Sequence, residues 1–282
     1  MATTSGLEGQ EPVRRGQFTY GGLTRAFRVS VPTTFQSSDH RSLVVLLHGC
    51  TQDADDVARG TRIDVRAAEM GVAVLMPEQP ATAHPQRCWN WYDPKHMQRD
   101  SGEAALIGEL ARVTADSLGV DPRRVSIVGL SAGAAMAVNV AALFPDRFAA
   151  VATHSGVPAL AAENVGEALA VMRAGRDDVA GLVARARAAM GAHARPVPIL
   201  IIHGAKDAVV SVLASHALAA QWEALNRSLG APASWVTLRI IPDLGHAWSG
   251  GDAAGSYTDP ATPEVTTEVL RFLIAHPMPS GR

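Results

Sequence analysis

The chain has 282 residues, enough for one large α/β domain or two small ones. Hydrophobic residues make up 47% of the chain and charged residues 18%, a balance typical of a soluble globular enzyme. The formal net charge of −2 argues against nucleic acid or an anionic membrane as the main partner, and no apolar run approaches the roughly 18 residues of a membrane span.

The N-terminal region predicts a tail followed by a hairpin. Residues 1–15 are small and polar, so we expect a disordered tail, and no signal peptide is visible in it. The segments 17–20 and 24–31 alternate between apolar and polar residues and contain aromatic residues. Joined by a Gly-Gly turn, they predict an antiparallel hairpin.

The rest of the chain alternates between strand-like and helix-like segments. Apolar runs predict strands over residues 42–47, 72–76, 125–128, 148–153, 198–203 and 235–241. Helical spacing predicts helices over residues 56–69, 102–118, 132–143, 211–229 and 262–275, with Gly71 as the cap of the first. This alternation predicts an α/β class: one doubly wound, mostly parallel sheet with helices on both faces.

We find no linker that would divide the chain, and we expect a single catalytic domain over residues 16–276. The Ala-, Gly- and Arg-rich segment 157–195 reads as a mostly helical insertion near the site, and residues 277–282 as a C-terminal tail. Right-handed crossovers place the loops after the parallel strands along one edge of the sheet. A candidate site is therefore expected where these loops meet.

One such loop contains the motif Gly129-Leu130-Ser131-Ala132-Gly133. It follows a β-branched run and precedes an alanine-rich helix, so it predicts the G-x-S-x-G nucleophile elbow, in which a tight turn exposes the serine hydroxyl. The two glycines are required because the strand and helix backbones nearly touch there. Ser131 would lie at the helix N-terminus, which favours developing negative charge.

A serine nucleophile needs a base and an acid that orients the base. In proteins with this elbow, the nucleophile, the acid and the base follow one another along the chain as Ser, Asp and His. That order selects Ser131, Asp207 and His246. Among competing acids, Asp243 lies only three residues before the histidine, and Asp252 follows it, out of order. We expect His48 and His203 to hydrogen-bond loop backbone.

Acyl transfer also needs donors for the oxyanion. The N–H of the residue after the nucleophile, Ala132, is one, and the loop after an early strand supplies the second. The N–H of Cys50 is our candidate for that second donor, with Thr51 as the alternative.

Several aromatic and histidine side chains are candidates for substrate binding. Trp248 comes two residues after His246, and we expect it to line the pocket, while Trp89 and Trp91 cluster in one loop. Ordinary core packing is the alternative for the tryptophans. His154 also follows a strand at the same edge, where substrate contact and a buried structural role are both open.

At this point the sequence resembles the poly(3-hydroxybutyrate) depolymerase family of esterases. The resemblance spans about residues 16–275. It is carried, in order, by His48-Gly49-Cys50-Thr51-Gln52, Cys88-Trp89-Asn90-Trp91, Gly102-Glu103, the elbow motif, His154-Ser155-Gly156, His203-Gly204 with Asp207, Gly245-His246-Ala247-Trp248-Ser249-Gly250-Gly251, and Gly255-Ser256-Tyr257-Thr258-Asp259-Pro260.

The resemblance implies an α/β-hydrolase esterase without cofactor or metal, a triad of Ser131, Asp207 and His246, and an oxyanion donor at Cys50. Two cysteines alone make neither a disulfide scaffold nor a zinc site. From the residues, Cys50 and Cys88 are compatible with a bridge or with two buried thiols. The resemblance, which carries both cysteines together, favours the bridge.

We therefore expect a serine carboxylesterase acting on hydroxyalkanoate esters or oligomers. The alternatives are a feruloyl, acetyl-xylan or synthetic-polyester esterase and, from another class, a non-catalytic binding protein with a hydrolase fold. A small ester or polyester oligomer is the expected partner, and the oligomeric state stays open. A bridge would indicate a secreted or periplasmic protein, and free thiols a cytoplasmic one.

Overall fold

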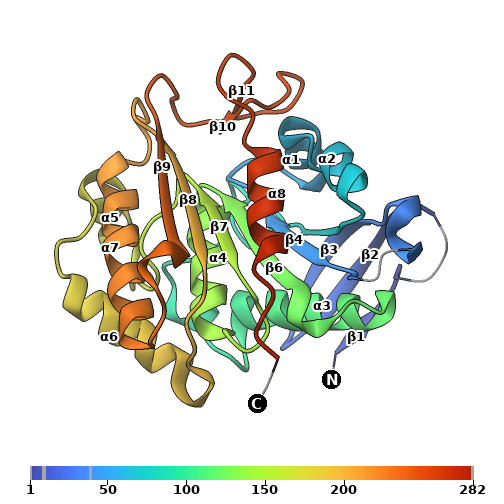
Figure 1. The fold of residues 1–282 in the computed structure, drawn as a ribbon, viewed down its shortest axis with the longest axis horizontal. Helices are drawn as coiled ribbons and strands as arrows, with labels where there is room; N and C mark the ends of the chain where they lie inside the picture. The colour runs from blue at the N-terminus through green and yellow to red at the C-terminus, as the bar shows by residue number, and fades with distance from the viewer. Residues whose placement is uncertain (1, 8–10, 38–39, 281–282) are drawn as a thin grey trace.

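The computed structural model describes residues 2–7, 11–37 and 40–280. Within them, a sheet of nine strands has the order β1-β2-β3-β5-β4-β6-β7-β8-β9 (Figure 1). The strands are β1 (Thr3–Thr4), β2 (Val13–Tyr20), β3 (Leu23–Ser30), β4 (Leu43–Leu47), β5 (Ala73–Pro77), β6 (Val125–Leu130), β7 (Val151–His154), β8 (Ile199–Gly204) and β9 (Val236–Ile241).

Strands β4 to β9 pair in parallel, which confirms the predicted α/β class and its mostly parallel sheet. Their continuous apolar sequences are explained by burial on both faces. In β4, Leu43, Val45 and Leu47 belong to one core cluster, whereas Val44 and Leu46 belong to the other. The carboxyl ends of these strands therefore meet at one edge, where the loops considered below lie.

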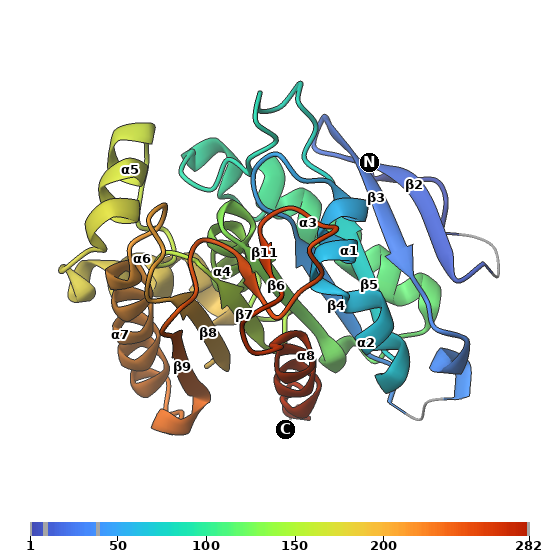
Figure 2. The ribbon, with the colours of Figure 1, turned by 90° about the horizontal axis from the view of Figure 1, so that it is seen from above.

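Helices cover both faces of the sheet (Figure 2). One face packs against α3 (Gly102–Leu118), α4 (Ala132–Leu143), α5 (Val165–Ala174), α6 (Val179–Met190) and α7 (Val212–Ser228). The other packs against α1 (Ala54–Thr61), α2 (Ile63–Met70) and α8 (Thr266–Ala275). Segment 157–195, predicted as mostly helical, supplies α5 and α6.

The N-terminal hairpin is present as β2 and β3, and β3 continues the sheet by pairing antiparallel with β5. The structure differs from the expected disordered tail over residues 1–15, because part of this segment forms strands. Thr3–Thr4 pair with Phe18 and Thr19, and β2 begins at Val13, so an added edge strand covers part of the hairpin. Residues 1 and 8–10 of that segment lie outside the described residues.

Two other segments depart from the predictions. The helix expected over 56–69 is two helices, because Arg62 adopts a left-handed backbone with φ 56° between α1 and α2. Gly60 lies two residues before the break, but the left-handed residue is Arg62 itself. The C-terminal tail is partly ordered, since the Met278 amide donates to the Arg123 carbonyl and the Arg123 guanidinium to the Ser280 hydroxyl; residues 281–282 lie outside the described residues.

A short second sheet pairs β10 (Trp248–Ser249) with β11 (Thr258–Asp259) above the parallel strands (Figure 1). It folds the C-terminal loops back over the carboxyl edge of the main sheet. No helix among the described residues combines the length and the apolarity needed to cross a membrane.

Candidate active site

Ser131 lies at the turn between β6 and α4 with φ 56° and ψ −119°, a backbone conformation that is strained for a residue with a side chain. The predicted need for glycines on both sides is met. A Cβ on Gly129 would lie 2.2 Å from the Gly133 carbonyl oxygen, and a Cβ on Gly133 would lie 2.2 Å from the Leu47 carbonyl oxygen. Strand and helix are thus in backbone contact, and the serine hydroxyl projects from the turn.

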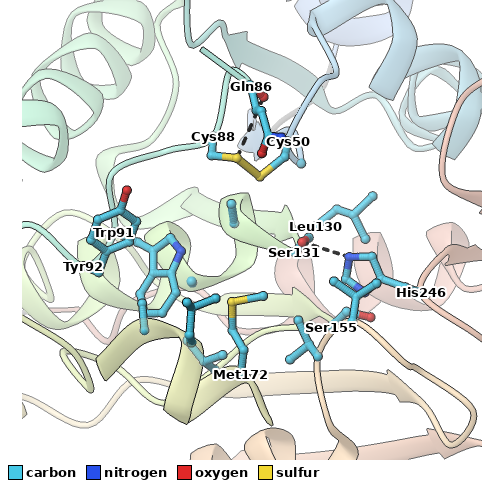
Figure 3. A pocket seen from close by; sticks show the side chains of 18 of the residues that line it. Cys50, Gln86, Cys88, Trp91, Tyr92, Leu130, Ser131, Ser155, Met172 and His246 are labelled. Atoms are coloured by element: carbon cyan, nitrogen blue, oxygen red, sulfur yellow. Dashed lines mark hydrogen bonds between the residues drawn. A yellow bond between two sulfur atoms is a disulfide. The ribbon is translucent and has the colours of Figure 1, made fainter. Parts of the chain in front are cut away.

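Ser131 is the first member of a continuous hydrogen-bonded chain of three side chains. Its Oγ lies 2.9 Å from Nε2 of His246, and Nδ1 of His246 lies 2.8 Å from Oδ2 of Asp207. Because Nδ1 donates to the carboxylate, Nε2 is left as the acceptor for the serine proton. The structure therefore brings together the three residues selected from the sequence. Figure 3 shows the contact between Ser131 and His246.

The Asp207 carboxylate is fully buried and has partners on both oxygens. Its Oδ1 accepts the amides of Val209 and Val210 at 2.9 and 2.8 Å. Nε2 of His203, which donates to the Val210 carbonyl at 2.8 Å, also lies 3.4 Å from Asp207 Oδ2. Burial alone would raise the pKa of Asp207, but the hydrogen bonds from His203 and His246 outweigh it and hold the pKa well below its usual range.

The competing acids are in different surroundings. Asp243 is 82% exposed and pairs with Lys206, Oδ1 to Nζ at 2.8 Å. Asp252 accepts the Ala254 amide in a surface turn. Neither carboxylate is hydrogen-bonded to His246 among the described residues.

The loop after β4 brings Cys50 to the same cavity as Ser131 and Ala132. The Thr51 amide donates to the Gln86 carbonyl oxygen at 2.6 Å, so it is engaged elsewhere. The Cys50 amide has no such acceptor among the described residues, and Ala132 is the first residue of α4, where backbone N–H groups lack helical partners. These two amides are the available donors beside Ser131.

Two buried side chains, His48 and Gln52, fix the backbone of the loop after β4 by hydrogen bonds. Nδ1 of His48 donates to the Gly49 carbonyl, and its Nε2 accepts the Gln79 amide at 3.0 Å. Gln52 accepts the Gly49 amide through Oε1 and donates to the Ser256 carbonyl through Nε2. Burial lowers the pKa of His48 to about 4, so the ring is neutral at pH 7 and its tautomer is set by these partners.

A disulfide also fixes the loop after β4. Cys50 and Cys88 form the disulfide that the family resemblance favoured, with Cα atoms 4.2 Å apart. The segment that carries Cys88 is in turn fixed by the fully buried carboxylate of Glu103. Its oxygens accept hydrogen bonds from the Arg25 guanidinium, the Gln79 side chain, and both the backbone and side-chain amides of Asn90.

Above Ser131 opens a cavity of about 390 Å³. Figure 3 shows the disulfide on one side, His246 on a second and Trp91 opposite His246, with Met172 across from the disulfide. Four α5 residues line it at helical spacing: Val165, Ala168, Leu169 and Met172. Trp91, expected from the sequence to bind substrate, lies in this wall.

The other expected substrate-binding residues lie elsewhere. Trp248 is fully buried, donates its indole N–H to Thr266 Oγ1 at 2.9 Å, and is absent from the cavity lining, so its predicted place in the pocket is wrong. It lies on β10, packs under α8 and stacks on His154 at 5.1 Å. Trp89 and His154 are also fully buried away from the cavity.

His154 belongs to the core as a neutral ring. Its Nε2 accepts the Ser249 amide, and its Nδ1 faces the Ser155 hydroxyl at 3.3 Å. Burial, with smaller contributions from His203 and His246, lowers the pKa of His154 to about 3. Of the two roles left open for His154, substrate contact and a buried structural role, the structure shows the buried structural role.

Sequence reasoning missed the α5 residues and Tyr257. The apolar positions of α5 repeat at the spacing i, i+3, i+4, i+7, a signal that was available but did not distinguish core from cavity. Tyr257 lines the cavity with its ring 6.3 Å from that of His246 and its hydroxyl 3.4 Å from Thr51 Oγ1. It lies in a motif that the resemblance contained but to which no role was assigned.

Comparisons with known proteins identify the family of the chain and its fold. A family model described as esterase PHB depolymerase matches residues 29–236, well over half of the chain. A poly(3-hydroxyalkanoate) depolymerase C from Paucimonas lemoignei is 34% identical over 171 residues, covering 60% of this chain and 41% of that protein. A feruloyl esterase B from Neurospora crassa is 32% identical over 117 residues, covering 41% of this chain and 39% of that protein.

Among solved structures, an acetyl xylan esterase from Aspergillus awamori superimposes with a TM-score of 0.67 at 20% identity, covering 79% of this chain and 89% of that one. At this identity the match speaks for the fold, an α/β-hydrolase fold. The sequence matches to the two relatives span less than half of each relative's own length.

Proposed function

The chain belongs to the esterase PHB depolymerase family, and from that premise we propose that it is a serine carboxylesterase with Ser131 as nucleophile, His246 as general base and Asp207 as the acid that orients it. The observation that carries the proposal is the pair of hydrogen bonds, 2.9 and 2.8 Å long, that joins the three side chains at a strained elbow. A binding protein of this fold would have no need to keep this geometry.

Acylation begins when the Ser131 oxygen attacks the ester carbonyl carbon while Nε2 of His246 takes the hydroxyl proton. The carbonyl oxygen becomes an oxyanion, which we expect the N–H groups of Ala132 and Cys50 to hold, since both residues line the cavity beside Ser131. The imidazolium is stabilised by the Asp207 carboxylate, whose pKa is held low, so it stays ionised. Nε2 then gives the proton to the alcohol oxygen, and the alcohol leaves with an acyl group on Ser131.

Deacylation repeats these steps with water as the nucleophile. His246 takes a proton from the water, the hydroxide attacks the acyl carbon, and the same two amides hold the second oxyanion. Collapse returns the proton to the Ser131 oxygen and releases the carboxylic acid. Every group required is present on this chain.

For the substrate we propose a hydroxyalkanoate ester or oligomer. The relative from Paucimonas lemoignei is named a poly(3-hydroxyalkanoate) depolymerase, and the apolar cavity at Ser131 supports a substrate of low polarity. Feruloyl and acetylxylan esterases among the matched proteins define the competing substrates. A panel of hydroxybutyrate oligomers, methyl ferulate and acetylated xylan compares the three directly.

The activity itself is tested with p-nitrophenyl butyrate. Ser131→Ala removes one oxygen from a half-buried turn that faces the cavity, so we expect an intact fold and a loss of several orders of magnitude in kcat. Wild-type protein that hydrolyses the ester no faster than Ser131→Ala would reject the esterase proposal and favour a binding protein.

We also place the protein in an oxidising compartment, because a disulfide persists where thiols are not kept reduced. Thiol titration of denatured protein isolated without reductant tests this. Two reactive thiols would contradict it.

A further inference from the structure

The polar and the apolar side chains that line the cavity at Ser131 lie in different parts of it. His246 and Tyr257 lie at one end, the disulfide and Gln86 along one side, and the remainder is lined mainly by apolar side chains. Those are Trp91, Tyr92, Ala135, Val157, Val165, Ala168, Leu169 and Met172. No Asp, Glu, Lys or Arg is among its lining residues in the described parts of the chain.

The proposed reaction determines which part of an ester faces which wall. In the tetrahedral intermediate, the attacked carbon bears the Ser131 oxygen, the oxyanion, the alcohol oxygen and the acyl chain. The oxyanion must point to the amides of Ala132 and Cys50, on the disulfide side. The alcohol oxygen must lie within reach of Nε2 of His246, which protonates it.

Only one direction is left for the acyl chain. Figure 3 shows Trp91 on the side of Ser131 opposite to His246, with Met172 between them on the wall facing the disulfide. The acyl chain therefore extends away from His246 into the space between Trp91 and α5. The alcohol leaves on the opposite side, past Tyr257 and Val209, which are 44% and 51% exposed.

On the basis of the proposed function, we propose that the space between Trp91 and α5 is the acyl-binding site, that it takes a neutral acyl group longer than acetyl, and that Ala168 and Met172 set the length accepted. The alcohol side is open and discriminates weakly. Ala168 and Met172 are thus specificity-determining residues for the esterase reaction.

The lining of α5 supports this assignment independently. Val165 and Leu169 are 56% and 45% exposed although they are large and apolar, and both line the cavity at its rim. Ala168, one turn away on the same face, is only 4% exposed and so lies deeper. An apolar stripe that runs from solvent into a cavity is unfavourable unless a ligand covers it.

Size points the same way. The cavity at Ser131 has a volume of about 390 Å³. An acetyl group has three non-hydrogen atoms and would leave most of it unfilled. Among the described residues, no lysine or arginine lines the cavity to pair with a charged acyl group.

The test uses p-nitrophenyl esters of acetate, butyrate, hexanoate and octanoate, which share one leaving group and differ only in the acyl chain. Each methylene buried in an apolar wall is worth about fourfold in kcat/KM, so butyrate should exceed acetate by about fifteenfold. Ala168→Leu fills the deep part of the cavity and should lower the octanoate-to-acetate ratio about tenfold. Met172→Ala opens it and should raise the same ratio.

Leu213→Ala is the matched control. Leu213 is a 54% exposed apolar residue at the start of α7, outside the cavity lining, and its loss should leave the ranking unchanged. A second series, butyrate esters of methyl, butyl and hexyl alcohols, should differ by less than about threefold. Melting temperatures verify that each variant is folded.

Two results would overturn the proposal while leaving the esterase intact. One is wild-type kcat/KM that is highest for acetate. The other is a ranking of acyl lengths that neither Ala168→Leu nor Met172→Ala alters. Absence of hydrolysis of every ester above the rate of Ser131→Ala would instead reject both the esterase and its acyl site.

Discussion

The two sides of Ser131 are stabilised differently. On the His246 side, hydrogen bonds converge on one carboxylate and orient the imidazole. On the Cys50 side, a disulfide and a buried ion pair fix the backbone of the loop after β4. Asp207 receives two amides and two imidazoles. The loop at Cys50 is fixed by Cys88, His48 and Gln52, with Glu103 behind them.

The difference separates two kinds of support. A change at Asp207 alters the charge that faces the imidazolium, so it acts on the chemical step itself. A change at the disulfide alters where an amide points and how many conformations the unfolded chain has, so it acts on stability and only partly on rate. The predictions below contrast the two sides, beginning with the largest effect.

Asp207→Asn should lower kcat about 10⁴-fold, because the amide selects the wrong imidazole tautomer and cannot stabilise the imidazolium. Steady-state kinetics on p-nitrophenyl butyrate measure it. Asp243→Asn is the matched control: that carboxylate is 82% exposed and pairs with Lys206, so its rate should stay within about twofold of wild type. The reverse outcome would mean that Asp243 is the acid.

The double variant Cys50→Ala/Cys88→Ala should lower the free energy of unfolding by about 3–4 kcal/mol, since the bridge closes a loop of 38 residues. At temperatures where the variant is folded, kcat should fall only about tenfold, because His48 and Gln52 still hold the loop. Urea unfolding and initial rates give the two numbers. A loss of kcat as large as that of Asp207→Asn would contradict the prediction that the disulfide acts mainly on stability.

The neutral buried histidines predict acid sensitivity. Burial lowers the pKa of His48 to about 4 and that of His154 to about 3, whereas both titrate near 6.5 when unfolded. The unfolded chain therefore binds more protons below pH 6.5, and stability falls as the pH drops through this window. Between pH 7 and 5 each histidine should cost about 2 kcal/mol.

Urea unfolding at pH 7 and pH 5 measures this loss. The pKa of Asp207 is depressed, so its contribution is lost only below the usual aspartate range and does not enter this window. His48→Gln keeps an acceptor for the Gln79 amide and cannot be protonated, so it should remove about half of the pH dependence. A wild-type stability that is flat from pH 7 to 5 would contradict the prediction.

His203 should have the smallest effect. It bridges the Val210 carbonyl and Asp207, so we expect His203→Leu to lower kcat about tenfold, equivalent to about 1.4 kcal/mol for one hydrogen bond to a charged group, with KM unchanged. His203→Gln keeps an N–H donor and should recover most of the rate. If both variants match wild type in kcat and differ only in melting temperature, His203 supports the fold and not the acid.

Local patterns predicted the fold well because the determining interactions are local. The continuous apolar runs reflect burial on both faces of a parallel sheet, and Gly129 of the elbow reflects a backbone contact with Gly133, four residues away. The break at Arg62 and the edge strand Thr3–Thr4 were not predicted, because neither changes the apolar periodicity. The edge strand also depends on pairing with Phe18 and Thr19, which lie well beyond it in the sequence.

What the sequence by itself determined is the α/β class with a mostly parallel sheet and the chain order of Ser131, Asp207 and His246, because the alternation of strands and helices and the elbow follow from residue type and spacing. What only the tertiary structure decided is which side chains face the cavity. Trp248 is two residues from His246, yet its indole turns under α8 to reach Thr266, while α5, distant in sequence, supplies the apolar wall. Side-chain direction in short loop strands depends on packing partners elsewhere in the chain, and spacing along the sequence carries no record of them.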